Sequence, residues 1–284
     1  MAKKSKIKIE PDNFEQEMTT IWSFKERGNW ATHNPNYRGN WSPYIPRNIL
    51  LRYSKEKDLV LDQFVGGGTT LVEAKLLNRN CIGIDINSEA IKLCKKVIDF
   101  DIPNAGNITL IKGNAQNLSK IKDKSIDLIC THPPYANIIK YSDGIKNDLS
   151  LLKVNDFIDA MKPVATESFR VLKDDKYCAI LIGDTRKNGR VIPLGYRVMK
   201  IFLNAGFKLK EIIIKEQHNC KATGYWKSSS LKYNFLLLAH EYLYIFVKDK
   251  AKVINRTQKE RYTIIDNKTG ETCSLDDLII DGIL

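Results

Sequence analysis

The sequence predicts an α/β protein with a doubly wound, mainly parallel seven-stranded sheet whose last strand pair is antiparallel. Short, continuously apolar runs recur along the chain, and segments with helical periodicity separate most of them. Continuous apolar runs are typical of strands that helices cover on both faces. A polar segment without helical periodicity joins the last two runs, and strands connected without a crossover helix pair antiparallel.

The apolar runs define the expected strands at 58–64, 81–86, 108–112, 126–131, 177–182, 209–215 and 241–248. The helical periodicity defines helices at 69–77, 88–100, 154–172 and 194–205, and Ser42 and Pro43 open a further helix that continues to about residue 52. Because no repeat or second core is evident, we expect one domain at 42–248. A segment at 1–41 precedes it, and a basic extension at 249–284 follows it.

The charge of the chain favours a polyanionic partner. Its 284 residues include 45 Lys and Arg against 33 Asp and Glu, which gives a formal net charge of +12. Such an excess indicates nucleic acid or an anionic membrane surface, and it makes an acidic small-molecule enzyme a poor first hypothesis. No run approaches the roughly 18 apolar residues of a membrane-spanning helix, and no secretory signal is recognisable. We therefore expect a cytoplasmic protein that does not enter a membrane.

The six cysteines predict neither a disulfide framework nor a metal site. They are scattered without a C-x-x-C pair, and Cys81, Cys130 and Cys178 lie inside apolar runs. Cysteines in this setting are typically small buried hydrophobic residues in a reducing compartment.

A glycine-rich loop after the first expected strand predicts a nucleoside-cofactor site. The candidate cofactor-binding residues are Asp62, Phe64, Gly66, Gly68, Thr69 and Thr70. Glycine lets a ligand approach the backbone, and the N–H groups of the next helix can bind a carboxylate or phosphate. Asp85 ends the following strand, where it can accept hydrogen bonds from a ribose diol. A structural turn with an Asp helix cap is the alternative.

The cofactor class follows from the spacing of the loop. A dinucleotide site normally shows G-x-G-x-x-G, but here two threonines follow Gly68 and no third glycine comes after them. This difference argues against NAD and favours S-adenosylmethionine, with its methionine part along Asp62 and the loop. Asn114, after the third expected strand, can bind the adenine amino group, although asparagine after glycine is equally typical of a turn.

Thr-His-Pro-Pro-Tyr at 131–135 is the most specific string in the sequence. Pro133 and Pro134 form a stiff segment after the fourth expected strand, at the edge where open α/β sheets bind ligands. The carbonyl of Pro133 can accept a hydrogen bond, and Tyr135 offers a face on which a planar base can stack. An exocyclic amine held there would point at the cofactor.

These motifs resemble those of amino-group nucleic-acid methyltransferases, which use S-adenosylmethionine to modify N4 of cytosine or N6 of adenine. Residues 62–70 are similar to the family's cofactor motif D-P-F-x-G-S-G-T-T, and residues 132–135 to its catalytic motif [D/N/S]-P-P-[Y/F/W]. The helix start at Ser42 and Pro43 is similar to an element that closes over the methionine carboxylate. The resemblance implies a class I methyltransferase-type, Rossmann-like fold and DNA methylation in a restriction–modification setting. It also implies the catalytic residues His132, Pro133, Pro134 and Tyr135.

His132 departs from the family pattern, in which Asp, Asn or Ser holds the target amine. A neutral imidazole can accept a hydrogen bond from the amine through one nitrogen, whereas a protonated imidazole only donates. We therefore expect activity to fall below about pH 6, near the ordinary histidine pKa. A histidine that merely caps a turn is the alternative.

The resemblance further implies direct methyl displacement onto a base that is flipped out of duplex DNA. N4 of cytosine is preferred over N6 of adenine, because Thr-x-Pro-Pro-Tyr resembles the serine-type motif most. The polar segment at 218–234 is the expected recognition loop. The candidate substrate contacts are Arg186, Lys221, Tyr225, Trp226, Lys227 and Ser229.

Two alternatives stay open. The substrate can be ribosomal or transfer RNA, because about 36 residues after 248 are too few for a large target-recognition domain. The chain can also be a non-catalytic nucleic-acid-binding module that retains the cofactor fold. The segment at 1–41 holds three of the four tryptophans and is expected to form a cofactor lid or a substrate wall. The oligomeric state is open, a homodimer included.

Overall fold

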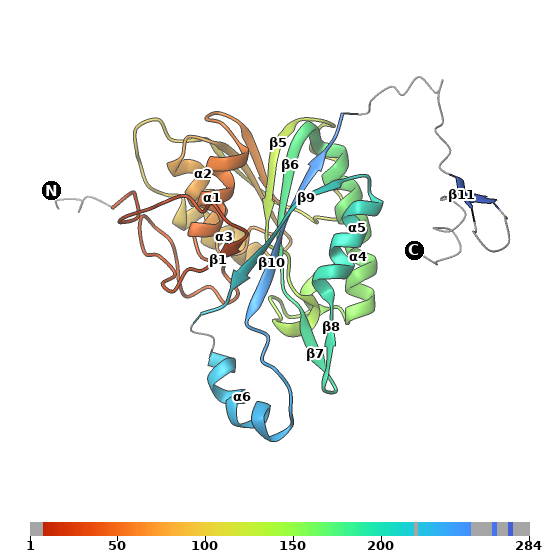
Figure 1. The fold of residues 1–284 in the computed structure, drawn as a ribbon. Helices are drawn as coiled ribbons and strands as arrows, with labels where there is room; N and C mark the ends of the chain where they lie inside the picture. Colours follow the sequence, from red (N-terminus) through yellow and green to blue (C-terminus); the bar gives the residue numbers. More distant parts are fainter. Residues whose placement is uncertain (1–7, 219–220, 251–262, 266–271, 275–284) are drawn as a thin grey trace. The chain divides into compact units, whose positions relative to one another are not determined.

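The computed structural model describes residues 8–218, 221–250, 263–265 and 272–274 (Figure 1). The chain divides into two compact units, Met1–Lys250 and Ala251–Leu284. The second unit contains an antiparallel pair, β11 (Thr263–Ile265) and β12 (Thr272–Ser274). The rest of the expected extension after residue 250 lies outside the described residues, as do residues 1–7 of the N-terminal segment and residues 219–220 of the expected recognition loop.

The first unit is built on an eight-stranded sheet in the order β1-β9-β10-β6-β5-β2-β3-β4. Within this sheet only β10 is antiparallel to its neighbours, β6 and β9. This arrangement confirms the predicted seven strands, and the two-residue β1 adds an eighth at the edge. The strands are β1 (Ile21–Trp22), β2 (Leu59–Asp62), β3 (Asn80–Asp85), β4 (Ile108–Lys112), β5 (Ile126–Thr131), β6 (Leu172–Ile182), β9 (Lys208–Glu216) and β10 (His240–Lys248).

Helices cover both faces of the sheet, as the continuous apolar runs predict (Figure 1). Two hydrophobic cores fill the space between helices and sheet. One packs against α4 and α5, and the other against α1, α2 and α3. The helices are α1 (Tyr44–Tyr53), α2 (Thr69–Leu76), α3 (Ser88–Val97), α4 (Val154–Val171), α5 (Leu194–Asn204) and α6 (Lys221–Lys232), with short 3-10 turns η1 (Ala136–Ile138) and η2 (Leu149–Leu151).

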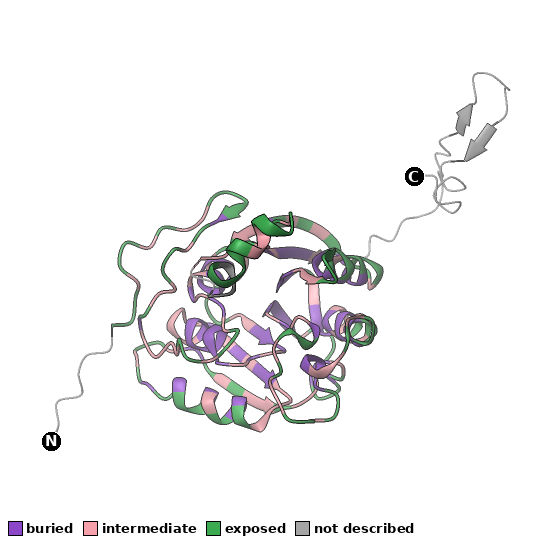
Figure 2. Cartoon of the chain, turned by 90° about the horizontal axis from the view of Figure 1, so that it is seen from below, coloured by how far each residue is buried: buried purple, intermediate pink, exposed green. Residues whose placement is uncertain are grey.

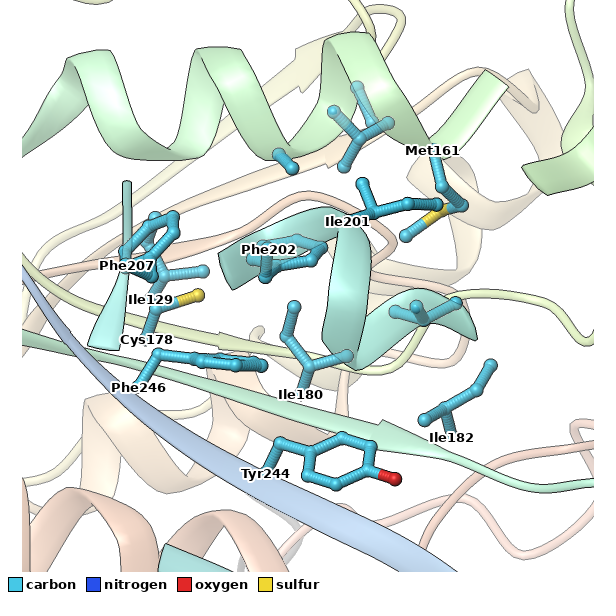
Figure 3. Close-up of a cluster of buried hydrophobic side chains, with 14 of the residues drawn as sticks. Ile129, Met161, Cys178, Ile180, Ile182, Ile201, Phe202, Phe207, Tyr244 and Phe246 are labelled. Carbon is cyan, nitrogen blue, oxygen red and sulfur yellow. The ribbon is translucent and has the colours of Figure 1, made fainter. Parts of the chain in front are cut away.

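Strand β6 shows how one strand serves both cores. Cys178, Ile180 and Ile182 pack in the core beneath α4 and α5 (Figure 3), whereas Ala179 and Leu181 pack in the other. Successive side chains of a strand point to opposite faces, so an unbroken apolar run is needed here. Buried residues accordingly concentrate on the strands and on the helix sides that face them (Figure 2).

The expected recognition loop at 218–234 is mostly helix, since α6 occupies Lys221–Lys232. Its sequence lacks the apolar stripe by which an amphipathic helix is recognised, so periodicity alone predicts a loop. Helical backbone hydrogen bonding extends past α6, with the Tyr233 N–H donating to the Ser229 carbonyl at 2.9 Å. Helix α6 and the hairpin of β7 (Thr185–Lys187) and β8 (Arg190–Ile192) project from the same end of the sheet (Figure 1).

Cys81, Cys130 and Cys178 are buried free cysteines, as the apolar runs that contain them predict, and Cys94 is also buried and free. Among the described residues, no three His, Cys, Asp or Glu side chains are grouped to bind a metal ion. No helix in the same part of the chain has the length and apolar character needed to cross a membrane.

Candidate functional site

A pocket lies where β2, β3, β4 and β5 end. Parallel strands bring their carboxyl ends to one edge of the sheet, so motifs far apart in sequence meet there. Eight of the predicted site residues line the pocket: Asp62, Phe64, Gly66, Asp85, Asn114, His132, Pro133 and Pro134. The cofactor motif and the catalytic motif therefore share one cavity.

Asp62 is a buried carboxylate at the end of β2. Its Oδ1 accepts hydrogen bonds from the Phe64 N–H at 3.1 Å and the Thr131 hydroxyl at 2.7 Å. Burial raises the pKa of Asp62 to about 6, although these hydrogen bonds act to lower it. A cation that entered the pocket beside Asp62 would favour its ionised form.

Asp85 connects the end of β3 to the glycine loop. Its carboxylate accepts hydrogen bonds from the Gly66 N–H at 3.0 Å and the Asn87 N–H at 2.8 Å. Burial raises the pKa of Asp85. Since a carboxylate has about four acceptor positions, the side chain retains capacity for a ligand hydroxyl.

The glycine loop is held close to the N-terminal segment. Gly66 has a φ of +48°, a conformation that side chains disfavour. A Cβ atom on Gly67 would lie 2.8 Å from Nδ2 of Asn40. Gly68, at a φ of +81°, is the N-cap of α2 and does not line the pocket, and a Cβ atom there would lie 2.8 Å from Val97.

Two segments cover the pocket. Residues 37–41 contribute Tyr37, Asn40 and Trp41, and the segment after β5 contributes Tyr141 and Asp148. The rings of Tyr37 and Tyr141 stack with centroids 5.9 Å apart. The structure thus places the end of the N-terminal segment in the pocket wall, whereas its other tryptophans, Trp22 and Trp30, are buried in the protein.

Glu73 on α2 anchors this N-terminal segment. Its fully buried carboxylate accepts hydrogen bonds from Trp30 Nε1 at 2.7 Å and from Arg47 Nη1 at 3.0 Å. His33 Nε2 lies 2.7 Å from the same carboxylate. These contacts tie the segment to α1 and α2 before it reaches the pocket.

His132 is packed between Trp41 and Tyr135. Its ring stacks on Trp41 with centroids 5.3 Å apart, and its Nε2 lies 2.7 Å from the Tyr135 hydroxyl. Burial lowers the pKa of His132 to about 4, with Lys215 adding to the effect and Glu241 opposing it. The sequence-based expectation used the ordinary histidine pKa, which does not apply to this buried imidazole, so protonation of His132 would not cause a loss of activity near pH 6.

Tyr135 lies behind His132 and does not line the pocket. Its hydroxyl donates to Glu241 Oε1 at 2.7 Å, and Lys215 Nζ contacts Glu241 Oε2 at 2.9 Å. Burial acts to raise the pKa of Glu241, but Lys215, His132 and Tyr135 outweigh it and the pKa is lowered. Sequence reasoning missed Glu241 and Lys215, and a lone acidic residue opening an apolar strand was the one available signal.

Other predicted cofactor residues support the pocket from outside. Thr69 donates to the Asn40 side chain, Thr70 is fully buried, and Ser42 donates to the Arg27 carbonyl, while Pro43 begins α1. The Asn114 side chain lines the pocket but bonds to Gln116, with its Oδ1 2.9 Å from the Gln116 nitrogen. It therefore has the contacts of a turn residue as well as a place in the wall.

The predicted substrate contacts do not line the pocket but lie on the two projections. Tyr225 and Trp226 on α6 are 77% and 48% exposed, Lys227 is exposed and Ser229 is half-buried. The Lys221 side chain lies outside the described part of the helix. Arg186 donates to the carbonyls of Gly189 and Leu236, so it joins the β7–β8 hairpin to the segment after α6.

Comparison with protein families gives two overlapping matches. A family model described as DNA methylase matches residues 1–96 and 126–277, which is most of the chain. A model described as RNA cap guanine-N2 methyltransferase matches residues 57–172.

Curated relatives match shorter segments. The Type II methyltransferase M2.LlaDCHI of Lactococcus lactis subsp. cremoris is 40% identical over 84 residues, which are 28% of this chain and 30% of the relative. M2.DpnII of Streptococcus pneumoniae is 37% identical over 89 residues, covering 30% and 32%. M.MjaVI of Methanocaldococcus jannaschii is 28% identical over 167 residues, covering 58% and 84%. The chain thus spans less than a third of the length of the first two relatives.

Solved structures share the fold. A SAM-dependent methyltransferase from Methanosarcina mazei superimposes with a TM-score of 0.51 at 19% identity, covering 71% of this chain and 97% of the other. TrmN from Thermus thermophilus gives a TM-score of 0.52 at 16% identity, covering 75% and 51%. Both comparisons confirm the predicted class I methyltransferase-type fold.

Proposed function

Since the chain belongs to the DNA methylase family of amino-group methyltransferases, which use S-adenosylmethionine, we propose that it methylates N4 of cytosine in DNA. One observation carries the proposal: the glycine loop and the His132-Pro133-Pro134 segment line the same pocket. The Type II methyltransferases among its relatives support DNA as substrate and a restriction–modification setting. The DNA methylase match covers more of the chain than the RNA methyltransferase match, which also favours DNA.

The residues of the pocket fit S-adenosylmethionine. Gly66 and Gly67 line the pocket, and because side chains there would meet Tyr37 and Asn40, the glycines let the N-terminal segment close on the loop. Asp85 can accept from the ribose hydroxyls, and Asp62 can pair with the methionine ammonium. When bound, the cofactor supplies an electrophilic methyl group.

The transfer requires that the target amine become a better nucleophile. Its lone pair is conjugated with the base, and two acceptors for its N–H bonds favour the tetrahedral geometry that frees the lone pair. The Pro133 carbonyl and the His132 imidazole are the proposed acceptors. Because burial holds the pKa of His132 at about 4, the imidazole is neutral and able to accept at physiological pH.

The catalytic motif favours cytosine over adenine as the target base. The string Thr-His-Pro-Pro-Tyr resembles the serine-type catalytic motif more than the Asp or Asn types. DNA itself is proposed to contact the two projections, where Lys227, Tyr225 and Trp226 offer cations and aromatic faces. A flipped base would then reach the pocket edge.

Transfer of a radiolabelled methyl group tests this function. The full chain is incubated with labelled S-adenosylmethionine in three separate reactions, which contain duplex DNA, ribosomal RNA or transfer RNA. Label in DNA that disappears with His132→Ala is the expected result. Label in RNA alone would favour the RNA methyltransferase instead, and cofactor binding without any transfer would favour a non-catalytic binding module.

A further inference from the structure

We infer that Glu241 and Lys215 are positioning residues for the transfer: through Tyr135 they hold the His132 proton on Nε2, which leaves Nδ1 as the acceptor for the target amine. This inference rests on the proposed function and deepens it. It assigns a role to a buried ion pair that neither the cofactor motif nor the catalytic motif contains.

Four side chains form a continuous hydrogen-bonded series. Lys215 Nζ contacts Glu241 Oε2 at 2.9 Å, the Tyr135 hydroxyl contacts Oε1 at 2.7 Å, and His132 Nε2 contacts that hydroxyl at 2.7 Å. Lys215 and Glu241 face each other as a register pair of β9 and β10. The sheet therefore fixes one end of the series, and the catalytic segment supplies the other.

The protons in this series have only one consistent arrangement. The ammonium of Lys215 only donates, and the ionised carboxylate of Glu241 only accepts. Tyr135 must therefore donate its single proton to Glu241, so its oxygen can only accept from His132. The imidazole must then carry its proton on Nε2, and a neutral imidazole has no second proton for Nδ1.

The second imidazole nitrogen, Nδ1, is left for a ligand. His132 lines the pocket, and no residue in the described ranges forms a hydrogen bond with its Nδ1. Stacking on Trp41 fixes the plane of the ring. The opposite tautomer would present an N–H group to the amine, so two donors would face each other and the amine would lose an acceptor.

Replacing one oxygen of Glu241 by an amide nitrogen should reverse the direction of the hydrogen bonds between Glu241, Tyr135 and His132. In Glu241→Gln, Lys215 can donate only to the amide oxygen, so the NH2 group faces Tyr135. The tyrosine oxygen then accepts from the amide and its hydroxyl donates to Nε2. The His132 proton moves to Nδ1, although every side chain keeps its place.

Nitrogen NMR of the full chain with labelled histidine measures this tautomer without any need for activity. The sequence contains four histidines, and the His132 signals are those that disappear in His132→Gln. The parent protein should carry its proton on Nε2, and Glu241→Gln should carry it on Nδ1. The kcat of Glu241→Gln should fall about 100-fold, as for loss of one preorganised polar contact, with the KM for DNA unchanged.

Two further variants complete the test. Glu216→Gln makes the same charge change at an exposed neighbour on β9 and should alter neither tautomer nor kcat. Tyr135→Phe keeps the aromatic face but removes the hydroxyl, so the tautomer preference should weaken and kcat should fall. It also keeps the inference testable if Glu241→Gln does not fold, which cofactor binding and circular dichroism would reveal.

The results separate this inference from the proposed function. A proton on Nδ1 in the parent, or an unchanged tautomer in Glu241→Gln or Tyr135→Phe, would overturn the positioning role even if DNA is methylated. The expected tautomers together with no transfer to any DNA would support the hydrogen-bonded series and reject the proposed function alone.

Discussion

Cofactor affinity should depend on the ionisation of Asp62. Burial raises the pKa of this carboxyl group to about 6, so the group is mostly ionised at pH 7 and mostly protonated at pH 5. The methionine part of S-adenosylmethionine carries an ammonium group, which pairs with the ionised form and not with the neutral acid. Lowering the pH therefore removes the partner that we assign to this ammonium.

The size of the effect follows from the pKa. With a pKa near 6, the ionised fraction is about 0.9 at pH 7 and about 0.1 at pH 5. If only the ionised form binds, the apparent Kd rises about tenfold over this interval, or about 1.4 kcal/mol. The direction is weaker binding at lower pH, because binding must first release the proton from Asp62.

Isothermal titration with S-adenosylhomocysteine, which carries the same amino-acid part, measures this change. Asp62→Asn is the matched control, since its amide oxygen can still accept from Phe64 and Thr131 while the titrating group is gone. This variant should bind more weakly at pH 7 and show little change between pH 7 and pH 5. Equal Kd values at the two pH values for the parent protein would refute the assignment of Asp62 to the ammonium.

Three further predictions concern other parts of the molecule. With saturating cofactor, kcat should not follow an ionisation near pH 6, because burial lowers the pKa of His132 to about 4, and a pH–rate profile from pH 7 to 5 measures this. Glu73→Ala should destabilise the protein by about 3–5 kcal/mol in urea denaturation, because it leaves the buried Arg47 with only the exposed Glu10 carboxylate, 3.8 Å away, as a charged partner. Lys227→Ala and Lys232→Ala on α6 should each weaken DNA binding and reduce the slope of log K against log salt by about 1.

Each of these predictions has a contrary result. A kcat that halves near pH 6 in the parent protein would contradict the first prediction. If Tyr135→Phe abolished this change, the titrating group would belong to the hydrogen-bonded series that contains His132. An unfolding free energy within about 0.5 kcal/mol of the parent for Glu73→Ala would show that the buried cluster is not an anchor. An unchanged salt dependence for both lysine variants would remove α6 from the DNA interface, and Lys92→Ala on α3 is the control on another face of the protein.

The sheet and the position of the pocket could be predicted from sequence because both depend on local signals. Apolar runs of strand length and the turn residues after them are contiguous in the chain. The loop at Gly66 and the segment at His132 each follow such a run, and parallel topology brings strand ends together. Eight predicted site residues consequently share the pocket.

The surroundings of His132 could not be predicted because they depend on distant residues. Glu241 contacts Tyr135 across 106 positions of sequence, and Trp41 of the N-terminal segment stacks on the imidazole. Burial among these residues lowers the pKa of His132, although the charge of Glu241 acts to raise it. Helix α6 was missed for a different reason, since it projects from the sheet and shows no apolar periodicity.

We propose that this pocket transfers a methyl group directly to a base amine in DNA. Nucleoside analysis by mass spectrometry of duplex DNA treated with the full chain and S-adenosylmethionine tests it most directly. We predict N4-methyldeoxycytidine, and its absence from the His132→Ala reaction. Methylation at carbon 5 of cytosine, or no methylated nucleoside in DNA despite cofactor binding, would contradict direct transfer to a base amine.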